Sequence, residues 1–273
     1  MRTIDCIIFN DEKLLLDLRF NILNNIVDFF VVCESSYDHH GRKKKINFSI
    51  EDYPKFKDKI IYFLNTKKPP SQNPWKNQAF QRNLIIDLLH FASDDDFVIY
   101  SDVDEIPNPE KIKYFINSSK KKFGIFLQKY FYYKLNLLSL DNNNKWEGSK
   151  ICKKKYLTDF EFLRTQIRIK NLRYKLYRID KLHLEKSIEI LKNGGWHFSY
   201  LMKIKDIINK IQTSVHNEFN KPEFKNMTYI KNIIKNYKDI FGREDVFVPV
   251  KINKIHFPEY ILKNKKKFNS WII

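Results

Sequence analysis

Short apolar runs alternate with segments of helical periodicity through the first half of the chain. The runs are continuous rather than alternating, which is typical of strands buried on both faces of a sheet. They lie at residues 3–9, 27–33, 59–65 and 97–100. Between the first two runs, apolar residues recur at helical spacing at Leu14, Leu15, Leu18 and Ile22. Strands that alternate with helices predict βαβ units and a largely parallel sheet of the α/β class.

Further helices follow from the same periodicity. One is predicted from Lys76 to Ala92, and the apolar residues on its core side are Phe80, Leu84, Ile85 and Leu88. Asn108 is expected to cap another helix, because Pro109 stands at its first position. The second half is less regular, with strands predicted at 123–133 and 194–200, a basic stretch at 150–180, and helices at 204–211 and 228–241. No internal repeat or linker interrupts the chain, which indicates a single domain.

An acidic stretch, "SDVDEIP" at residues 101–107, follows directly on the apolar run at 97–100. Ligands of open α/β sheets bind beyond the carboxyl ends of the strands, where Asp102 and Asp104 would lie. Carboxylates this close repel one another unless a cation lies among them. The pair is therefore predicted to bind Mg²⁺ or Mn²⁺, with coordination positions left for phosphate. The alternative is an ordinary surface turn or helix cap, since acidic residues before proline are common in loops.

A second stretch, "GGWHFSY" at residues 194–200, places His197 inside an aromatic strand. The glycine pair before it would let the backbone approach a ligand closely. His197 is a candidate third metal ligand, and the alternative is a histidine packed in the core.

The composition is strongly basic, with 50 Lys and Arg against 32 Asp and Glu and a formal net charge of +18. Such a charge suits a binder of nucleic acid or of an anionic surface, although lysine also accumulates through A/T-rich codon usage. The basic runs at 41–45 and 263–268 lack the aromatic interleaving of an RNA-binding sheet, so no nucleic acid is expected. Contact with a membrane surface through these patches is the remaining expectation for the charge.

Nothing in the sequence predicts a membrane span or a secretion signal. No apolar run approaches the roughly 20 residues of a membrane-spanning helix, and the N-terminal apolar run is short and soon broken by charge. Three widely spaced cysteines, Cys6, Cys33 and Cys152, indicate neither disulfides nor a zinc site. A soluble cytoplasmic protein with reduced core cysteines is expected.

Four stretches together resemble glycosyltransferase family 17. They are residues 8–35, "SDVDEIP" at 101–107, "GGWHFSY" at 194–200 and "FPEYILKN" at 257–264, in the order of that family. The resemblance implies a GT-A fold, a UDP-sugar donor (UDP-N-acetylglucosamine in the known member), a glycan acceptor and inverting transfer helped by Mn²⁺ or Mg²⁺. It also implies a nucleotide-sugar-binding half at about 1–108 and an acceptor-binding half at about 109–273. Family members that add a bisecting sugar carry a membrane anchor and an acidic residue where this chain has Ser101.

An inverting transfer needs a general base for the acceptor hydroxyl. With Asp102 and Asp104 assigned to the metal, the candidates are Glu147, Glu105 and Glu161. We favour Glu147, because Trp146 and a glycine flank it and suit a sugar platform.

Other residues are candidates for substrate contacts. Glu34 and Ser35 follow a strand at the ligand edge of the sheet, where Asp102 would also meet the donor. Gln78 and Arg82 lie one helical turn apart, and Arg82 is expected to hold a phosphate unless it is an exposed helix cation. The acceptor candidates are Trp146, His216 and Glu218. For His216 and Glu218 the alternative is that they are ordinary polar residues at the end of a surface helix.

Two other functions remain as alternatives. A metal-dependent phosphotransferase of the haloacid-dehalogenase type also uses two aspartates at a strand end, but normally on the first strand, whereas this pair follows about the fourth. A basic binder of nucleic acid or anionic surfaces would show affinity that falls steeply with salt.

Overall fold

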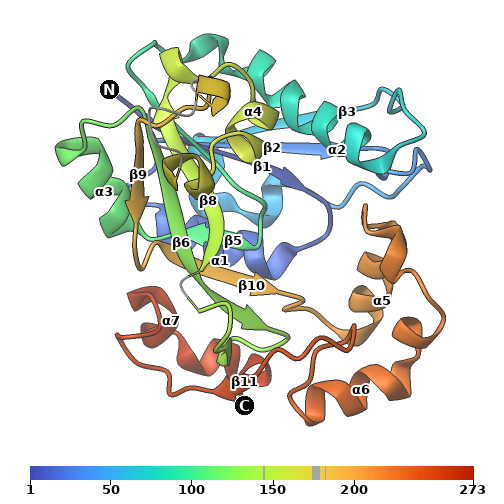
Figure 1. Ribbon diagram of the computed structural model, residues 1–273. Helices are drawn as coiled ribbons and strands as arrows, with labels where there is room; N and C mark the ends of the chain where they lie inside the picture. Colours follow the sequence, from blue (N-terminus) through green and yellow to red (C-terminus); the bar gives the residue numbers. More distant parts are fainter. Residues whose placement is uncertain (144, 174–178, 182) are drawn as a thin grey trace.

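The computed structural model describes residues 1–143, 145–173, 179–181 and 183–273 (Figure 1). Its strands are β1 (Thr3–Phe9), β2 (Phe29–Ser35), β3 (Ile60–Asn65), β4 (Phe97–Tyr100), β5 (Glu105–Pro107), β6 (Phe123–Tyr132), β7 (Leu137–Ser139), β8 (Trp146–Lys153), β9 (Ile188–Leu191), β10 (Gly195–Ser199) and β11 (Phe247–Pro249). Its α-helices are α1 (Lys13–Leu23), α2 (Pro74–Asn83), α3 (Pro109–Ser118), α4 (Phe160–Thr165), α5 (Ile204–Thr213), α6 (Met227–Lys235) and α7 (Glu259–Lys263).

The strands form one mixed sheet in the order β11-β7-β6-β8-β4-β1-β2-β3, with β5, β9 and β10 joined at its side. The first half is parallel as predicted, since β1 pairs in parallel with both β2 and β4, and β2 with β3. The second half departs from that expectation, because β8 runs antiparallel to both β4 and β6. The architecture is an α/β domain consistent with the expected GT-A type.

Helices cover both faces of the sheet, and each face has its own apolar core (Figure 1). On one face, residues of α1, α3 and α7 such as Leu16, Phe115 and Ile261 share a cluster with β1 and β2. On the other face, Leu89 and Leu163 pack with Ile4 and Val98. A third cluster joins α5 and α6 to the ends of β6, β7 and β11. Because a core packs on each face of the sheet, successive residues of its central strands are all buried, which explains the continuous apolar runs in the sequence.

The helix predicted from Lys76 to Ala92 differs from the observed one. It begins at Pro74, where the side chain of Asn73 accepts a hydrogen bond from Trp75 N, and it changes at Leu84 into a 3-10 helix. The buried residues of α2 include Asn77, Gln81 and Arg82, whereas Phe80 is only partly buried. The predicted core side holds in the 3-10 part, where Ile85 is buried and Leu88 packs against the same cluster, but not in α2, which turns polar side chains toward a pocket.

The glycine pair lies against the backbone of neighbouring strands. A Cβ on Gly195, which has a φ of +136°, would lie 2.1 Å from Ile106 O. A Cβ on Gly194 would lie 2.7 Å from Leu127 N. The pair therefore lets the chain pass closely between β5 and β6, and the predicted close approach of the backbone is seen here toward these strands.

Two smaller expectations have clear outcomes. Cys6 and Cys33 are free thiols buried in the core, as predicted, and Cys152 is likewise free and buried. Within the described part of the chain, the helices are too short or too polar for any of them to cross a lipid bilayer.

Candidate functional site

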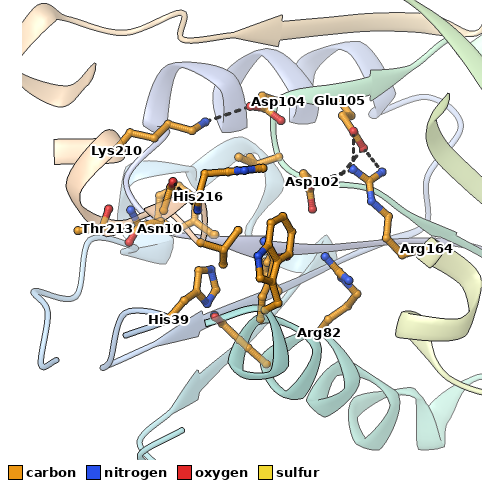
Figure 2. A pocket seen from close by; sticks show the side chains of 18 of the residues that line it. Asn10, His39, Arg82, Asp102, Asp104, Glu105, Arg164, Lys210, Thr213 and His216 are labelled. Atoms are coloured by element: carbon orange, nitrogen blue, oxygen red, sulfur yellow. Dashed lines mark hydrogen bonds and ion pairs between the residues drawn. The ribbon is translucent and has the colours of Figure 1, made fainter. Parts of the chain in front are cut away.

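A pocket of about 500 Å³ opens where the parallel strands end (Figure 2). Segments that follow β1, β2 and β4 contribute Asn10, His39 and Asp102, and α2 contributes Arg82. Helix α5 adds Lys210 from the C-terminal part of the chain. Because β1, β2 and β4 are parallel, their carboxyl ends meet at one edge, which is where ligands of such sheets bind. Residues of both predicted halves, 1–108 and 109–273, line this pocket.

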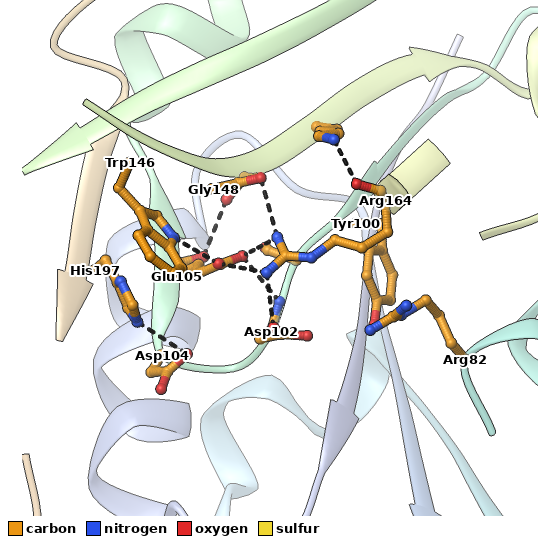
Figure 3. A network of polar contacts seen from close by, with 12 residues as sticks. Arg82, Tyr100, Asp102, Asp104, Glu105, Trp146, Gly148, Arg164 and His197 are labelled. Atoms are coloured by element: carbon orange, nitrogen blue, oxygen red, sulfur yellow. Dashed lines mark hydrogen bonds and ion pairs between the residues drawn. The ribbon is translucent and has the colours of Figure 1, made fainter. Parts of the chain in front are cut away.

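The acidic turn lies in the pocket wall and is held by Arg164 of α4 (Figure 3). Arg164 Nη2 donates to Asp102 Oδ2 at 2.9 Å and to Glu105 Oε1 at 2.8 Å, and Arg164 Nη1 donates to Glu105 Oε2 at 2.8 Å. Trp146 Nε1 also donates to Glu105 Oε1, at 2.7 Å. Glu105 is buried at the pocket wall, and these contacts anchor the turn there.

Asp104 is paired with a different cation. Lys210 Nζ lies 3.1 Å from Asp104 Oδ2 and 3.7 Å from Glu12 Oε1, while His197 Nε2 lies 3.7 Å from Asp104 Oδ1. Burial alone would raise the pKa of Asp104, but Lys210 and His197 lower that pKa well below its usual range. Burial likewise would lower the pKa of Lys210, but Asp104 and Glu12 raise it. Both groups are therefore charged at neutral pH.

Arg19 of α1 holds the acidic turn from below. Its guanidinium is fully buried and makes two hydrogen bonds of 2.6 Å with the carboxylate of Asp5. It also donates to Glu105 O at 2.8 Å, to Asp102 O at 3.3 Å and to Ser101 Oγ at 2.6 Å. The turn therefore has a backbone shape that is fixed by a side chain of the core.

These three cations change the interpretation of the acidic stretch. We expected the carboxylates to need a metal ion because they would otherwise repel one another. Arg164, Lys210 and Arg19 supply that positive charge from the protein itself, so the cluster by itself does not require a metal.

The residues nevertheless fit a divalent ion. Asp102 Oδ1 is buried and has no hydrogen-bond partner, and Asp104 Oδ1 and His197 Nε2 lie side by side. Among the described residues no three acidic, histidine or cysteine side chains form a ready-made metal cluster. This arrangement suits Mg²⁺ or Mn²⁺, which are commonly held by one or two carboxylates and completed by phosphate and water. His197 as a ligand stays a prediction; its ring packs on Trp146, with centroids 4.5 Å apart, and on Tyr130 at 4.7 Å.

The other wall of the pocket is formed by α2 and α4. Arg82 is 4% exposed and donates to Tyr100 Oη at 2.8 Å, and it forms an ion pair with Glu161. The alternative that Arg82 is an exposed helix cation is therefore wrong. Gln78 and Glu161 also line the pocket, as do Trp146 and His216.

Four predicted residues are not brought into the pocket lining. Glu34 is buried, and its carboxylate accepts from Lys44 Nζ, Tyr62 Oη and two backbone amides, so it anchors a loop instead. Ser35 is also buried, and its Oγ accepts from Tyr37 N. The carboxylate of Glu147 pairs with Arg168 at 2.9 Å.

Glu218, the fourth of these residues, lies beside the pocket. Its carboxylate contacts His216 Nδ1 at 2.7 Å, and both side chains are exposed. Of the pair, only His216 reaches the lining.

Several lining residues were missed by the sequence reasoning. Arg164 and Lys210 look like ordinary helix cations in a lysine-rich chain, so only their distant partners distinguish them. Trp75 is 50% exposed at the pocket rim, where its ring meets His216 edge to face at 4.8 Å. His39 is neutral at pH 7, because burial and the nearby Arg82 lower its pKa to about 4.

Lys150 of β8 supports Arg164 from within the core. Its Nζ donates to Arg164 O at 2.6 Å and also to Ile167 O, at the end of α4. Burial, with Arg164 and Arg168 nearby, lowers the pKa of Lys150 to about 7. The buried amine thus fixes the position from which Arg164 reaches the acidic turn.

Comparison with known proteins places these features in a family. The model of glycosyltransferase family 17 matches residues 1–151, which is more than half of the chain. The chain is 23% identical to the beta-1,4-mannosyl-glycoprotein 4-beta-N-acetylglucosaminyltransferases of Homo sapiens and Rattus norvegicus. Each alignment covers 98% of this chain and 54% of the relative, so the chain spans about half the length of these proteins. The chain therefore belongs to glycosyltransferase family 17.

Proposed function

We propose that the protein transfers a sugar from a UDP-sugar to a glycan acceptor, with inversion at the transferred carbon and with help from a divalent ion. N-acetylglucosamine is the proposed sugar, because the similar human and rat proteins are named as N-acetylglucosaminyltransferases. The observation that carries the proposal is the pocket at the carboxyl edge of the sheet. It combines the free Asp102 Oδ1 with arginine and lysine side chains, which together suit a metal-bound diphosphate.

The pocket residues divide into two groups in this proposal. Asp102, Asp104 and His197 would hold the divalent ion, which would supply positive charge to the leaving nucleoside diphosphate. Arg82 lies on the opposite wall, and its fixed guanidinium suits a phosphate oxygen. Arg164 keeps Asp102 oriented while leaving its second oxygen free.

The contacts of the three candidate carboxylates support one of them as the general base. Both oxygens of Glu105 are occupied by Arg164 and Trp146, and Glu147 lies outside the pocket lining. Glu161 lines the pocket with a side chain that is 33% exposed, and its carboxylate forms an ion pair with Arg82. We assign the role of proton acceptor to Glu161.

Glu161→Gln should lower kcat by about 10²–10⁴-fold, the usual contribution of a general base. Glutamine keeps an oxygen that can accept from Arg82, so the pocket should keep its shape. Steady-state kinetics with a saturating donor measure the effect, and Glu147→Gln is the matched control, expected to retain turnover close to wild type. Equal loss in the two variants, or normal turnover in Glu161→Gln, would argue against this assignment.

Screening purified protein against nucleotide sugars tests the function itself. A UDP-sugar at about 100 times its Kd should stabilise the fold by about 2.7 kcal/mol, which raises Tm by about 5–10 °C. This shift should appear with Mn²⁺ and disappear in chelator, because Asp102 and Asp104 would hold an ion whose positive charge would attract the diphosphate. Equal stabilisation by UDP in chelator contradicts the metal dependence, and no response to any nucleotide sugar contradicts the function.

A further inference from the structure

Lys210 differs from the two arginines that hold the acidic turn, because its charge sits on a single nitrogen at the end of a flexible stem. Its Nζ forms ion pairs with the carboxylates of Asp104 and Glu12 and lies 5.6 Å from the centroid of the Tyr200 ring, and its side chain is 25% exposed in the pocket (Figure 2). Arg19 and Arg164, in contrast, are each held by several hydrogen bonds to the turn. A lysine ammonium on a flexible four-carbon stem can exchange partners without a change of backbone.

The two oxygens of Asp104 face different groups. Oδ2 accepts from Lys210, whereas Oδ1 lies 3.7 Å from His197 Nε2, on the side proposed for the metal. A divalent ion at Oδ1 would stand close to the ammonium of Lys210, and two cations on one carboxylate repel each other. Without another anion, Lys210 and the ion therefore compete for Asp104.

A nucleoside diphosphate removes that competition. Its oxygens bring negative charge to the ion and offer the ammonium a new partner within the same pocket. Phosphate is a good acceptor for lysine, which binds it as a point charge.

We propose that Lys210 is an exchangeable counter-ion: it neutralises Asp104 in the ligand-free protein and moves to the diphosphate when the donor binds with its metal. This inference rests on the proposed function and deepens it. It makes metal binding weak before the donor arrives and couples the two binding events, as linkage between ligands of one site requires.

The inference predicts opposite changes in two affinities. Lys210→Met removes the competing charge, so Mn²⁺ alone should bind about tenfold more tightly. The same variant loses a charge-assisted contact to phosphate, so UDP in saturating Mn²⁺ should bind about 10–100-fold more weakly. Isothermal titration calorimetry of the whole chain with Mn²⁺ alone and then with UDP measures both affinities.

Matched variants separate this role from a merely structural one. Lys205→Met removes an exposed lysine from the same helix and should change neither affinity. Lys210→Arg keeps the charge and should keep the weak binding of Mn²⁺ alone, and Lys210→Gln serves if the methionine variant does not fold. Any result for the neutral variants other than tighter Mn²⁺ and weaker UDP overturns the inference. If wild-type protein binds both ligands, the proposed function survives that failure; if it binds neither, both fail.

Discussion

Asp102→Asn is expected to lower the rate of sugar transfer by at least about 10²–10³-fold, equivalent to about 2.7–4 kcal/mol of transition-state stabilisation. The substitution keeps the shape of the side chain but removes the charge that would bind the ion. Asp102 Oδ2 already accepts from Arg164, so the free Oδ1 is the atom whose loss matters. Asp104→Asn should reduce the rate similarly, because it removes the carboxylate shared by His197 and Lys210.

Kinetics at saturating Mn²⁺ and donor, with Tm recorded for each variant, separate lost chemistry from lost folding. Asp95→Asn is the matched control, since the side chain of Asp95 is 61% exposed and pairs with Lys153 and Lys155 at the surface. It should leave turnover unchanged. Normal Mn²⁺-dependent turnover in both Asp102→Asn and Asp104→Asn would eliminate the metal assignment.

Arg19→Met should lower the free energy of unfolding by about 3–5 kcal/mol, the usual cost of leaving one member of a buried ion pair without its partner. Asp5 would stay buried with no compensating charge, and both side chains are fully buried in the wild type. The loss should also free the backbone of the acidic turn, which Arg19 contacts at Asp102 O and Glu105 O.

Chemical denaturation of three variants tests this explanation. The double variant with Arg19→Met and Asp5→Leu should recover part of the lost stability, because no charge is then left alone in the core. Lys263→Met, which breaks an exposed ion pair with Glu259, should be close to wild type. If Arg19→Met had the same free energy of unfolding as Lys263→Met, the buried ion pair would not contribute to stability as proposed.

Strands buried on both faces were predictable, because they are continuous apolar runs with few alternatives. The predicted limits of 3–9 and 97–100 match β1 and β4, and the second strand lies two residues later than predicted. Strand β8 was missed and fell partly in a stretch interpreted as basic. Its central Lys150 is 1% exposed, and that burial depends on carbonyl oxygens of Arg164 and Ile167 that no local pattern reveals.

The candidate site was predictable only where it follows from strand ends. Asp102 and Asp104 were located correctly in the pocket because they come directly after β4. Glu147 and Trp146 were both assigned to the site, although neighbouring residues of a strand point to opposite faces. Trp146 points to the pocket, so Glu147 cannot. Arg164 was missed because its partnership with Asp102 is set by the fold and not by spacing.

The long separation between the acidic turn and its cations has a consequence for synthesis on the ribosome. Arg164 comes 62 residues after Asp102, and Lys210 comes 106 residues after Asp104. At about 5–20 residues per second, Arg164 emerges about 3–12 s and Lys210 about 5–21 s after the carboxylates that they neutralise. During that interval Arg19 is already present, but it contacts only the backbone and Ser101 of the turn. Until then the carboxylates of the turn lack these two partners, and the lining of the pocket is complete only after α5 has been made.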